Sequence, residues 1–358
     1  MQKIQKDEKK NFYLNRFIPA IVLVVILIAL LVIMSFSFRS DLYANFSNAG
    51  FWVLRITSVL LLGLISGWIF YELSKAYSHM LVPSIILTIF FVGSLMLGPD
   101  MFTNVLFGHG KVGQFELNIN RIDNPKDLSG ATYFGYLLTA YVFDFWTPLT
   151  SLIIVLIFFL IRLIVIKNLN MTGLIYKTFS LWFISLIVTI FIKMFVVLMT
   201  QPYGIELILL MIVIASSYDM GGYFGGKFLG HKFIKAKLAP AISPKKTWEG
   251  AFVGYVVSFI ATILYIYIVW GIRGQSANSV AGVLNNISSR FFPFLLVFLF
   301  VAPVIALFGD LYFSLVKRRN EIKDFSNILK EHGGVLDRID SISFVFVFFG
   351  ILGAFSVL

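Results

Sequence analysis

Phe17–Phe38 reads FIPAIVLVVILIALLVIMSFSF and contains no charged residue. A helix needs roughly 20 apolar residues to cross a hydrocarbon core about 30 Å thick, so this run is long enough to span a membrane. Five basic residues precede it. The run is too long for the apolar part of a signal peptide, and it lacks a small-residue cleavage site. It therefore predicts a first transmembrane helix, with the N-terminus on the cytoplasmic side.

Similar apolar runs recur along the chain, and we expect each of them to form a membrane-spanning helix. They are Phe51–Phe70, Leu81–Gly98, Pro148–Ile166, Phe179–Met199, Gly204–Ser217, Gly250–Gly271, Phe291–Gly309 and Ser341–Leu358. The run at Gly204–Ser217 is the shortest of them. The predicted fold class is an all-α integral membrane protein, a polytopic bundle of about nine transmembrane helices with two functional cytoplasmic loops.

The composition supports this class and excludes several kinds of chemistry. Hydrophobic residues make up 59% of the 358 residues, charged residues make up 13%, and the mean hydropathy is +0.89. A soluble protein of this length would need far more polar residues to cover its surface. The absence of cysteine excludes thiol catalysis, disulfides and thiolate metal sites. The four histidines are scattered without zinc-ligand spacing, so any metal is expected to be held by oxygen, as magnesium is.

The formal net charge of +11 comes from basic residues that are gathered in a few loops. In the predicted topology, 21 of the 29 lysines and arginines fall on the side of the N-terminus and seven on the other side. This bias fits the positive-inside rule and predicts that two basic loops, Tyr218–Glu249 and Asp310–Asp340, are cytoplasmic. Charge confined to such loops argues against a nucleic-acid partner. Abundant Phe, Ile, Lys and Asn are typical of an AT-rich bacterial genome, so we expect a multi-pass protein of a bacterial cell membrane.

The chain divides into two predicted regions. Residues 1–202 hold the N-terminal transmembrane helices, with a polar insert on the outer side at about 99–140, and residues 203–358 carry the polar motifs. Tyr133–Phe143, within the insert, is apolar but too short to span, so it is expected to lie in the interface or to re-enter the membrane. Lys193 lies inside a span about two turns from its outer end, and we expect its side chain to snorkel to the surface.

The first polar segment contains two pairs of glycines. Ser217–Lys227 reads SYDMGGYFGGK, with Asp219 ahead of both pairs. Paired glycines allow a backbone to approach a ligand and to offer its N–H groups, but they are also common where membrane helices pack together. Both interpretations remain open from the sequence.

The same loop continues at Ile242–Gly250 with ISPKKTWEG. Ser243 as N-cap and Pro244 as the first helical residue predict that a helix starts here. Lys245 and Lys246 would then lie in the first turn, where positive charge opposes the helix dipole unless an anion such as phosphate is bound. The sequence favours such an anion site over the alternative, that both are ordinary cytoplasmic lysines.

The second polar segment alternates acids and bases. Asp310 follows an apolar run directly, and Asp337 and Asp340 are three residues apart, so on a helix they would share a face. Acids in the first turn of a helix are favourable without any function, which is the alternative interpretation. It does not explain four acids interleaved with four bases: Asp310, Asp324, Asp337 and Asp340 with Lys317, Arg318, Lys323 and Arg338. Carboxylates that bind divalent cations, together with bases that bind phosphates, are what phosphoryl or nucleotidyl transfer needs.

Ser314–Asp340 resembles the signature of phosphatidate cytidylyltransferases, also called CDP-diacylglycerol synthases. It matches in the Ser-x-x-Lys-Arg opening, the Lys-Asp pair and the closing His-Gly-Gly-x-x-Asp-Arg-x-Asp. Lys330 departs from the family, which more often has proline or another turn former there. The first polar segment is similar through Asp219, its glycines and its Ser-Pro-Lys-Lys-Thr-x-Glu-Gly run. The resemblance covers about Tyr203–Leu358, and the N-terminal half is similar only as a series of apolar spans.

The resemblance implies that residues 203–358 are a catalytic transmembrane region. A phosphate oxygen of phosphatidate would attack the α-phosphorus of CTP, giving CDP-diacylglycerol and pyrophosphate, with Mg²⁺ bound as one or two ions. Catalysis would rest on positioning and charge stabilisation. The reaction makes CTP, phosphatidate and membrane lipids the expected partners. The family commonly forms dimers, so a second copy of the chain is expected as well.

The resemblance also assigns roles to residues of this sequence. The catalytic residues would be Asp310, Asp337, Asp340, Lys323 and His332, although His332 could equally have a structural role in the glycine turn that follows it. The metal ligands would be Asp310 and Asp337, with Asp219 and Asp340 as further candidates. The substrate-binding residues would be Asp219, Ser243, Lys245, Lys246, Thr247, Glu249, Lys317, Arg318 and Arg338.

Two other functions remain as alternatives. A related CTP-dependent transferase would share the nucleotide site but act on another lipid acceptor, such as a polyprenol-type alcohol or an ether-lipid phosphate. A transporter would instead place ionisable residues near the middle of its spans and would not need clustered loop carboxylates. The sequence shows the opposite pattern.

Overall fold

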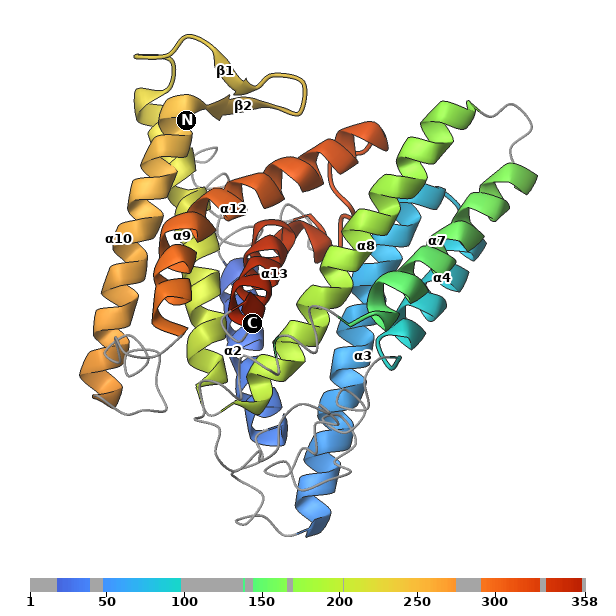
Figure 1. Cartoon of the computed structure of the whole chain (residues 1–358), viewed down its shortest axis with the longest axis horizontal. Coiled ribbons are helices and arrows are strands. Elements are labelled where there is room, and N and C mark those ends of the chain that lie inside the picture. The colour runs from blue at the N-terminus through green and yellow to red at the C-terminus, as the bar shows by residue number, and fades with distance from the viewer. Residues whose placement is uncertain are drawn as a thin grey trace, which may run out of the picture.

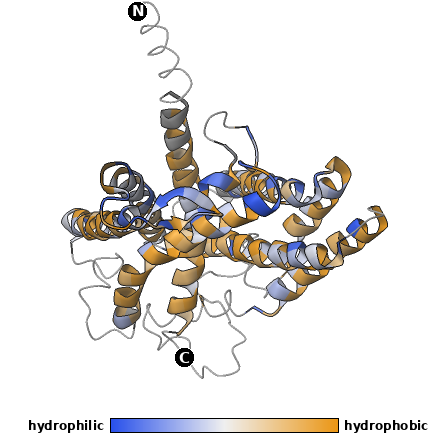
Figure 2. Ribbon diagram, turned by 90° about the horizontal axis from the view of Figure 1, so that it is seen from above, coloured by the Kyte–Doolittle hydropathy of each residue, from blue (hydrophilic) through white to orange (hydrophobic). Residues whose placement is uncertain are grey.

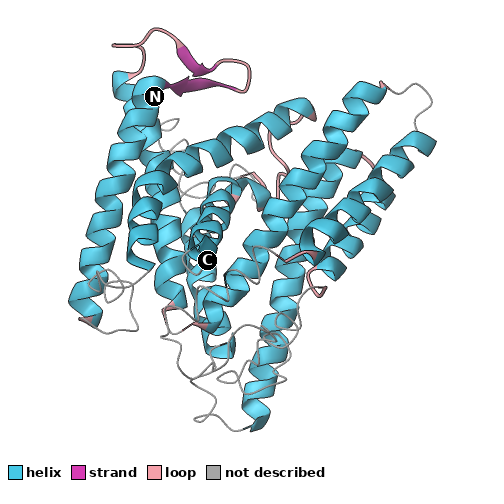
Figure 3. Ribbon diagram, viewed as in Figure 1, coloured by secondary structure: helices cyan, strands magenta, loops and turns pink. Residues whose placement is uncertain are grey.

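The computed structural model describes residues 18–38, 48–97, 138, 144–165, 170–201, 203–274, 291–328 and 333–355. The predicted insert at 99–140 lies outside these ranges except for Leu138. Helices dominate the described part, where one small hairpin is the only sheet (Figure 3). The α-helices are α2 (Ile18–Phe38), α3 (Asn48–Ser78), α4 (Leu81–Ser94), α7 (Trp146–Val165), α8 (Met171–Thr200), α9 (Gly204–Leu229), α10 (Trp248–Arg273), α12 (Phe291–Arg319) and α13 (Asp340–Phe355). A 3₁₀ turn, η5 (Leu336–Arg338), precedes α13.

Each predicted span coincides with a helix, and the predicted fold class is confirmed. Six of the described helices are long and apolar enough to cross a membrane: α3, α7, α8, α9, α10 and α12. α4 and α13 are apolar but shorter, and in α2 the stretch Val25–Phe38 is apolar. Large apolar side chains face outward, as Leu64 and Ile164 do with 71% and 83% exposure, and hydrophobic colour dominates the helices in Figure 2. Such a surface suits contact with lipid, and the protein is an all-α polytopic membrane protein.

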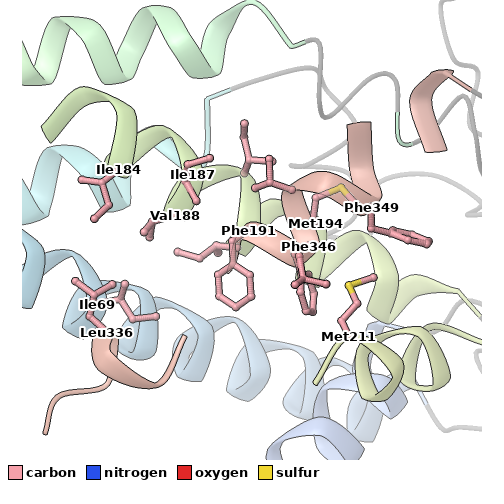
Figure 4. Packing of buried hydrophobic residues seen from close by; sticks show 14 of the residues in the cluster. Ile69, Ile184, Ile187, Val188, Phe191, Met194, Met211, Leu336, Phe346 and Phe349 are labelled. Atoms are coloured by element: carbon pink, nitrogen blue, oxygen red, sulfur yellow. The ribbon is translucent and has the colours of Figure 1, made fainter. Parts of the chain in front are cut away.

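α8 lies at the centre of the helix packing. Its apolar side chains pack against α13, α9 and α3, as Figure 4 shows for Ile184, Ile187, Val188, Phe191 and Met194 of α8 with Phe346 and Phe349 of α13, Met211 of α9 and Ile69 of α3. The rings of Phe191 and Phe346 meet edge to face, with their centroids 4.9 Å apart. The core therefore crosses the predicted boundary at residue 202, and the division into two regions stays a prediction.

α9 and α10 form the most extensive helix pair, and glycines make their close approach possible. A Cβ built on Gly221 would lie 2.7 Å from Val257 Cβ, and one built on Gly254 would lie 2.8 Å from the Tyr218 carbonyl oxygen. Both distances are too short for a side chain to fit. Small residues four positions apart are typical of close helix pairs in membranes. Of the two interpretations of the glycine pairs, helix packing is thus supported for Gly221.

Two predicted loops begin later than the hydropathy indicates. α9 continues to Leu229, so Asp219 lies on a helix, and α12 continues to Arg319, so Asp310 lies inside a helix rather than at its end. The loop starts predicted at 218 and 310 are wrong, because a fall in hydropathy marks the edge of the apolar surroundings and not the end of backbone hydrogen bonding. α12 also changes direction along its course, with Pro303 inside it (Figure 1).

The segment that contains Ser243 forms a β-hairpin beside the start of α10 (Figure 1). β1 (Lys237–Ala239) pairs with β2 (Ser243–Thr247) in antiparallel orientation. The prediction that Ser243 and Pro244 begin a helix is therefore wrong. Proline is tolerated in a short edge strand as well as in the first turn of a helix, so the Ser-Pro pattern does not distinguish the two.

α10 begins at Trp248, and Thr247 is its N-cap. The Gly250 amide donates to Thr247 Oγ1 at 3.1 Å, the bond that an N-cap side chain normally accepts. Lys245 and Lys246 lie on the strand before this helix. The dipole of α10 therefore does not repel these two lysines from within its first turn, and any phosphate binding must rest on their own charge.

The expected snorkelling of Lys193 is also wrong. Its side chain is buried, and Nζ donates to Leu97 O at 3.0 Å, Thr147 Oγ1 at 2.6 Å and Asp144 Oδ2 at 3.3 Å. A buried acid at the start of α7 offers this lysine a partner inside the protein, so it does not need to reach the surface.

Candidate functional site

Three carboxylates from three helices lie near one another. Asp219 comes from α9, Asp310 from α12 and Asp340 from the first turn of α13. Ser341 joins two of them: its Oγ donates to Asp219 Oδ2 at 3.2 Å, and its backbone N donates to Asp340 Oδ1 at 2.7 Å. Asp310 lies close enough for its charge to act on both. We call Asp219, Asp310 and Asp340 the carboxylate cluster, and like charges this close repel one another.

Gly309 allows Asp310 to reach this position. A Cβ built on Gly309 would lie 3.0 Å from the Asp340 carbonyl oxygen and 3.1 Å from Ser341 Cα. A side chain at this point would push α12 away from the start of α13. The glycine thus sets how closely the two acids approach.

Lys246 brings a positive charge to the carboxylate cluster. Its Nζ pairs with Asp310 Oδ2, while Ser314, one turn further along α12, donates from Oγ to Asp310 Oδ1 at 3.3 Å. Both side chains of the ion pair are 23% exposed, so the pair borders solvent. The charge of Lys246 also acts on Asp219. Lys245 is exposed and, as the residue before Lys246 on the strand, points to the opposite face.

Asp337 has different surroundings. Its Oδ1 accepts from Lys317 Nζ at 2.8 Å, and its Oδ2 accepts from the amides of Phe325 and Gly334, both at 2.9 Å. The ion-paired side chains are only 12% and 6% exposed. Gly333, with a φ of +75°, places its backbone against the same carboxylate. Asp337 therefore organises the loop between α12 and α13.

Asp337 and Asp340 do not share a helix face. Asp337 belongs to η5, whereas Asp340 opens α13. The prediction from their spacing is wrong, because the rule holds only within one continuous helix. The role of Asp337 as a metal ligand stays a prediction.

Three further predicted residues contribute to the surroundings of the site. Thr247 caps α10, and Glu249 accepts hydrogen bonds from the amides of Phe233 and Ile234 at 3.0 and 2.7 Å. These contacts fix the chain on both sides of the hairpin. The charge of Arg338 acts on Asp219.

The structure shows no contact with the carboxylate cluster for the other predicted residues that it describes. Ser243 is half-buried on β2, and Arg318 and Lys323 are exposed at and after the end of α12. His332 lies outside the described residues, so its catalytic role is untested. Within the described residues, no group of three or more acidic or histidine side chains has the arrangement of metal ligands.

One buried acid near the site was missed by the sequence analysis. Glu72, on α3, is 1% exposed and accepts hydrogen bonds from the amides of Val335 and Leu336. A single acid shortly after the apolar run Phe51–Phe70 looks like an ordinary membrane boundary. Its partners lie 263 and 264 residues further along the chain, beyond the reach of any local pattern.

Comparison with known proteins agrees with the signature on which the site was predicted. A phosphatidate cytidylyltransferase from Haemophilus influenzae is 37% identical over 151 residues, which are 42% of this chain and 46% of that protein. The proteins of the same name from Helicobacter pylori and Bacillus subtilis are 38% identical over 158 residues and 36% identical over 148 residues. These matches cover 44% and 41% of this chain, and 49% and 47% of the two relatives. The chain spans about half the length of the curated relatives it matches.

The family comparison covers more of the chain than the individual relatives do. The Cytidylyltransferase family matches residues 78–356, which include every predicted site residue and the whole carboxylate cluster. The resemblance noted from the signature is thereby confirmed, and this chain belongs to the Cytidylyltransferase family.

Proposed function

We propose that this chain is a CTP:phosphatidate cytidylyltransferase, an enzyme that transfers the cytidylyl group of CTP to phosphatidate. The observation that carries the proposal is the carboxylate cluster beside Lys246. Acids suited to a divalent cation and a base suited to phosphate lie together on membrane helices, where a water-soluble nucleotide can meet a lipid. Family membership and the names of the relatives support the choice of substrates.

The reaction requires no covalent enzyme intermediate. A phosphate oxygen of phosphatidate attacks the α-phosphorus of CTP, and the bond from the α-phosphorus to the oxygen that bridges to the β-phosphorus breaks. That oxygen leaves with pyrophosphate, and the new phosphorus–oxygen bond completes CDP-diacylglycerol. Charge moves between phosphate oxygens throughout, so the protein acts by positioning the reactants and stabilising charge.

The carboxylate cluster fits Mg²⁺ in its chemistry. It offers oxygen ligands, which Mg²⁺ prefers, and the mutual repulsion of its acids would fall if a cation were bound among them. Asp310 would be the principal ligand, with Asp219 and Asp340 beside it. Asp337, the other ligand expected from the signature, is better suited to hold the loop. When bound, Mg²⁺ would neutralise part of the charge on the triphosphate.

Basic residues near the cluster would hold the phosphates. Lys246 is the first candidate, because a triphosphate would compete with Asp310 for its ammonium group. Arg338 acts electrostatically on the same cluster and suits bidentate contact with a phosphate. Lys317 is already paired with Asp337, so its main role would be in the loop.

The proposal includes the setting of the enzyme. The basic loops around the site would face the cytoplasm of a bacterial cell, where CTP is available, and the helices would lie in the cell membrane, which supplies phosphatidate. A homodimer and the absence of a nucleic-acid partner are part of the same proposal.

A direct assay tests this function. Purified protein in detergent, with Mg²⁺, labelled CTP and phosphatidate, should give CDP-diacylglycerol and pyrophosphate in equal amounts, and EDTA should abolish both products. Activity with a polyprenol-type or ether-lipid acceptor, but not with phosphatidate, would support the related CTP-dependent transferase instead. A folded protein that consumes no CTP with any of these acceptors would contradict the proposal.

A further inference from the structure

Glu72 is an acid buried in a membrane helix with four hydrogen-bond donors around its carboxylate. Oε1 accepts from Trp68 Nε1 at 2.8 Å, from Ser326 Oγ at 2.5 Å and from the Val335 amide at 3.1 Å. Oε2 accepts from the Leu336 amide at 2.8 Å. One donor belongs to α3 itself, and the other three belong to the loop between α12 and α13.

Such a group is unfavourable in apolar surroundings unless its partners are held in place. The side chain of Glu72 is 1% exposed, so water cannot replace a lost donor easily. Each hydrogen bond from the loop therefore stabilises the buried carboxylate and at the same time fixes the position of the loop. An apolar side chain at this position would fill the space but could not hold two backbone amides.

Asp337 holds the same loop from within. Asp337 Oδ2 accepts from the amides of Phe325 and Gly334, while Glu72 accepts from Ser326 and from the residue that follows Gly334. Two carboxylates thus bind adjacent donors in both arms of one loop. A Cβ built on Gly334 would lie 2.5 Å from Glu72 Oε2, so only glycine allows the loop to approach Glu72 this closely.

The held segment leads directly into the site. Leu336, whose amide Glu72 binds, is two residues before Arg338 and four before Asp340. The turn η5 and the start of α13 are therefore fixed in position relative to α3. Glu72 lies before residue 78, where the match to the Cytidylyltransferase family begins, so the family comparison assigns it no role.

We infer that Glu72 is a positioning residue, which holds the segment 334–336 and so keeps Arg338 and Asp340 in place at the carboxylate cluster. This inference rests on the proposed function for its effect on catalysis, but the contacts stand independently of it. The N-terminal helices then contribute to the active site through one carboxylate, without touching a substrate.

Glu72→Gln tests the inference with almost no change in size. One of the two oxygens becomes an NH₂ group, which cannot accept, so at least one buried donor of the loop loses its partner. We expect kcat for cytidylyl transfer to fall about tenfold to a hundredfold, with KM for CTP changed less than about threefold, because the loss is in alignment rather than in binding. Ser326→Ala removes one donor only and should lower kcat a few-fold.

The matched control is Glu206→Gln. Glu206 is also an acid on a long apolar helix, and its Oε1 pairs with Arg273 Nε at 2.8 Å, but it lies in the first turn of α9, 13 residues before Asp219. This variant should keep the wild-type kcat. Glu72→Asp keeps both acceptor oxygens on a shorter side chain and should recover part of the activity that Glu72→Gln loses.

Hydrogen exchange separates this inference from the proposed function. In Glu72→Gln the amides of 325–328 and 333–336 should exchange faster than in the wild type, while the helices keep their protection. If the wild type makes no CDP-diacylglycerol, the proposed function fails, and faster exchange confined to this loop would still support the positioning role. Unchanged kcat and unchanged exchange in Glu72→Gln would overturn the inference, and so would a loss of protection spread evenly over all helices.

Discussion

Two groups of acids in this protein differ in the groups that surround them. In the carboxylate cluster, Asp219, Asp310 and Asp340 lie near one another, and the ammonium of Lys246 at the edge of solvent is the ion-pair partner of Asp310. The second group, which we call the loop acids, consists of Asp337 and Glu72. The loop acids point their oxygens at backbone amides and other donors of the chain itself.

The difference teaches how one side-chain type serves two purposes. Acids whose oxygens are filled by the chain's own donors stabilise a particular backbone conformation. Acids that crowd together with a partly exposed base keep unfavourable repulsion, which a ligand can relieve. The signature contains members of both groups, so its residues do not all belong to the chemistry of the site.

The largest effect is expected for Asp310→Asn, which removes the central charge of the carboxylate cluster with little change in size. The rate of CDP-diacylglycerol formation should fall about a hundredfold to a thousandfold, as when a preorganised charged group is lost from an active site. Glu321→Gln, a change at an exposed acid just after α12, is the matched control and should keep the wild-type rate. More than a tenth of the wild-type rate in Asp310→Asn would show that the cluster is not the catalytic centre.

Asp337→Asn, unlike Asp310→Asn, should lower the stability of the protein together with its activity. It removes the ion-pair partner of Lys317 in a mostly buried position, which costs about 3 kcal/mol of unfolding free energy. Unfolding in detergent measures this, and Asp310→Asn serves as the comparison because it should change stability far less. If Asp337→Asn keeps its stability but loses its Mg²⁺-dependent activity, Asp337 is a metal ligand and the two groups of acids do not differ as described.

Lys246→Ala should weaken the binding of CTP. Removing a phosphate-binding charge at the border of solvent should raise KM for CTP about tenfold, which corresponds to about 1.4 kcal/mol. Lys245→Ala, the neighbouring change on the opposite face of β2, should raise it less than about threefold. Equal effects of the two changes would indicate that only the overall charge of the hairpin matters.

The smallest effect on catalysis is expected from the scaffold that carries Asp219, where a substitution acts on stability. Gly221→Ala places a methyl group 2.7 Å from Val257 Cβ and should destabilise the protein by about 1–3 kcal/mol. At Gly222 the nearest atom to an added Cβ is 3.7 Å away, so Gly222→Ala should leave stability unchanged or raise it by up to about 1 kcal/mol. Equal unfolding temperatures of the two variants would mean that α9 and α10 do not depend on this close approach.

The sequence predicts the helices well and their ends poorly. Apolar runs are a local property, so each span could be located from its own residues. The ends at Leu229 and Arg319 depend on backbone hydrogen bonding beyond the membrane, which hydropathy does not report. The start of α10 at Trp248 depends on which of two possible residues is its N-cap. Thr247 is the N-cap rather than Ser243, because the chain before α10 pairs as a hairpin.

The site was predictable as a set of residues but not as a set of contacts. The spacing of acids and bases identified Asp310 and Asp340, which the structure brings together. It could not tell that Asp337 bonds to Lys317 and two amides, because the loop folds back on itself. Glu72 was missed because its importance depends on donors from the other end of the chain.

The chain is made and inserted from its N-terminus, so the hydrogen bonds of Glu72 can form only in a certain order. Trp68 lies one turn earlier on α3, so its Nε1–H is available to Glu72 as soon as this helix forms. Ser326 is made 254 residues later, and the amides of Val335 and Leu336 follow. Until then the carboxylate of Glu72 has only one of the four donors that it has in the complete fold. The loop with Ser326, Val335 and Leu336 supplies the remaining donors once it has been synthesised. These hydrogen bonds favour the packing of α3, an early helix, against one of the last parts of the chain.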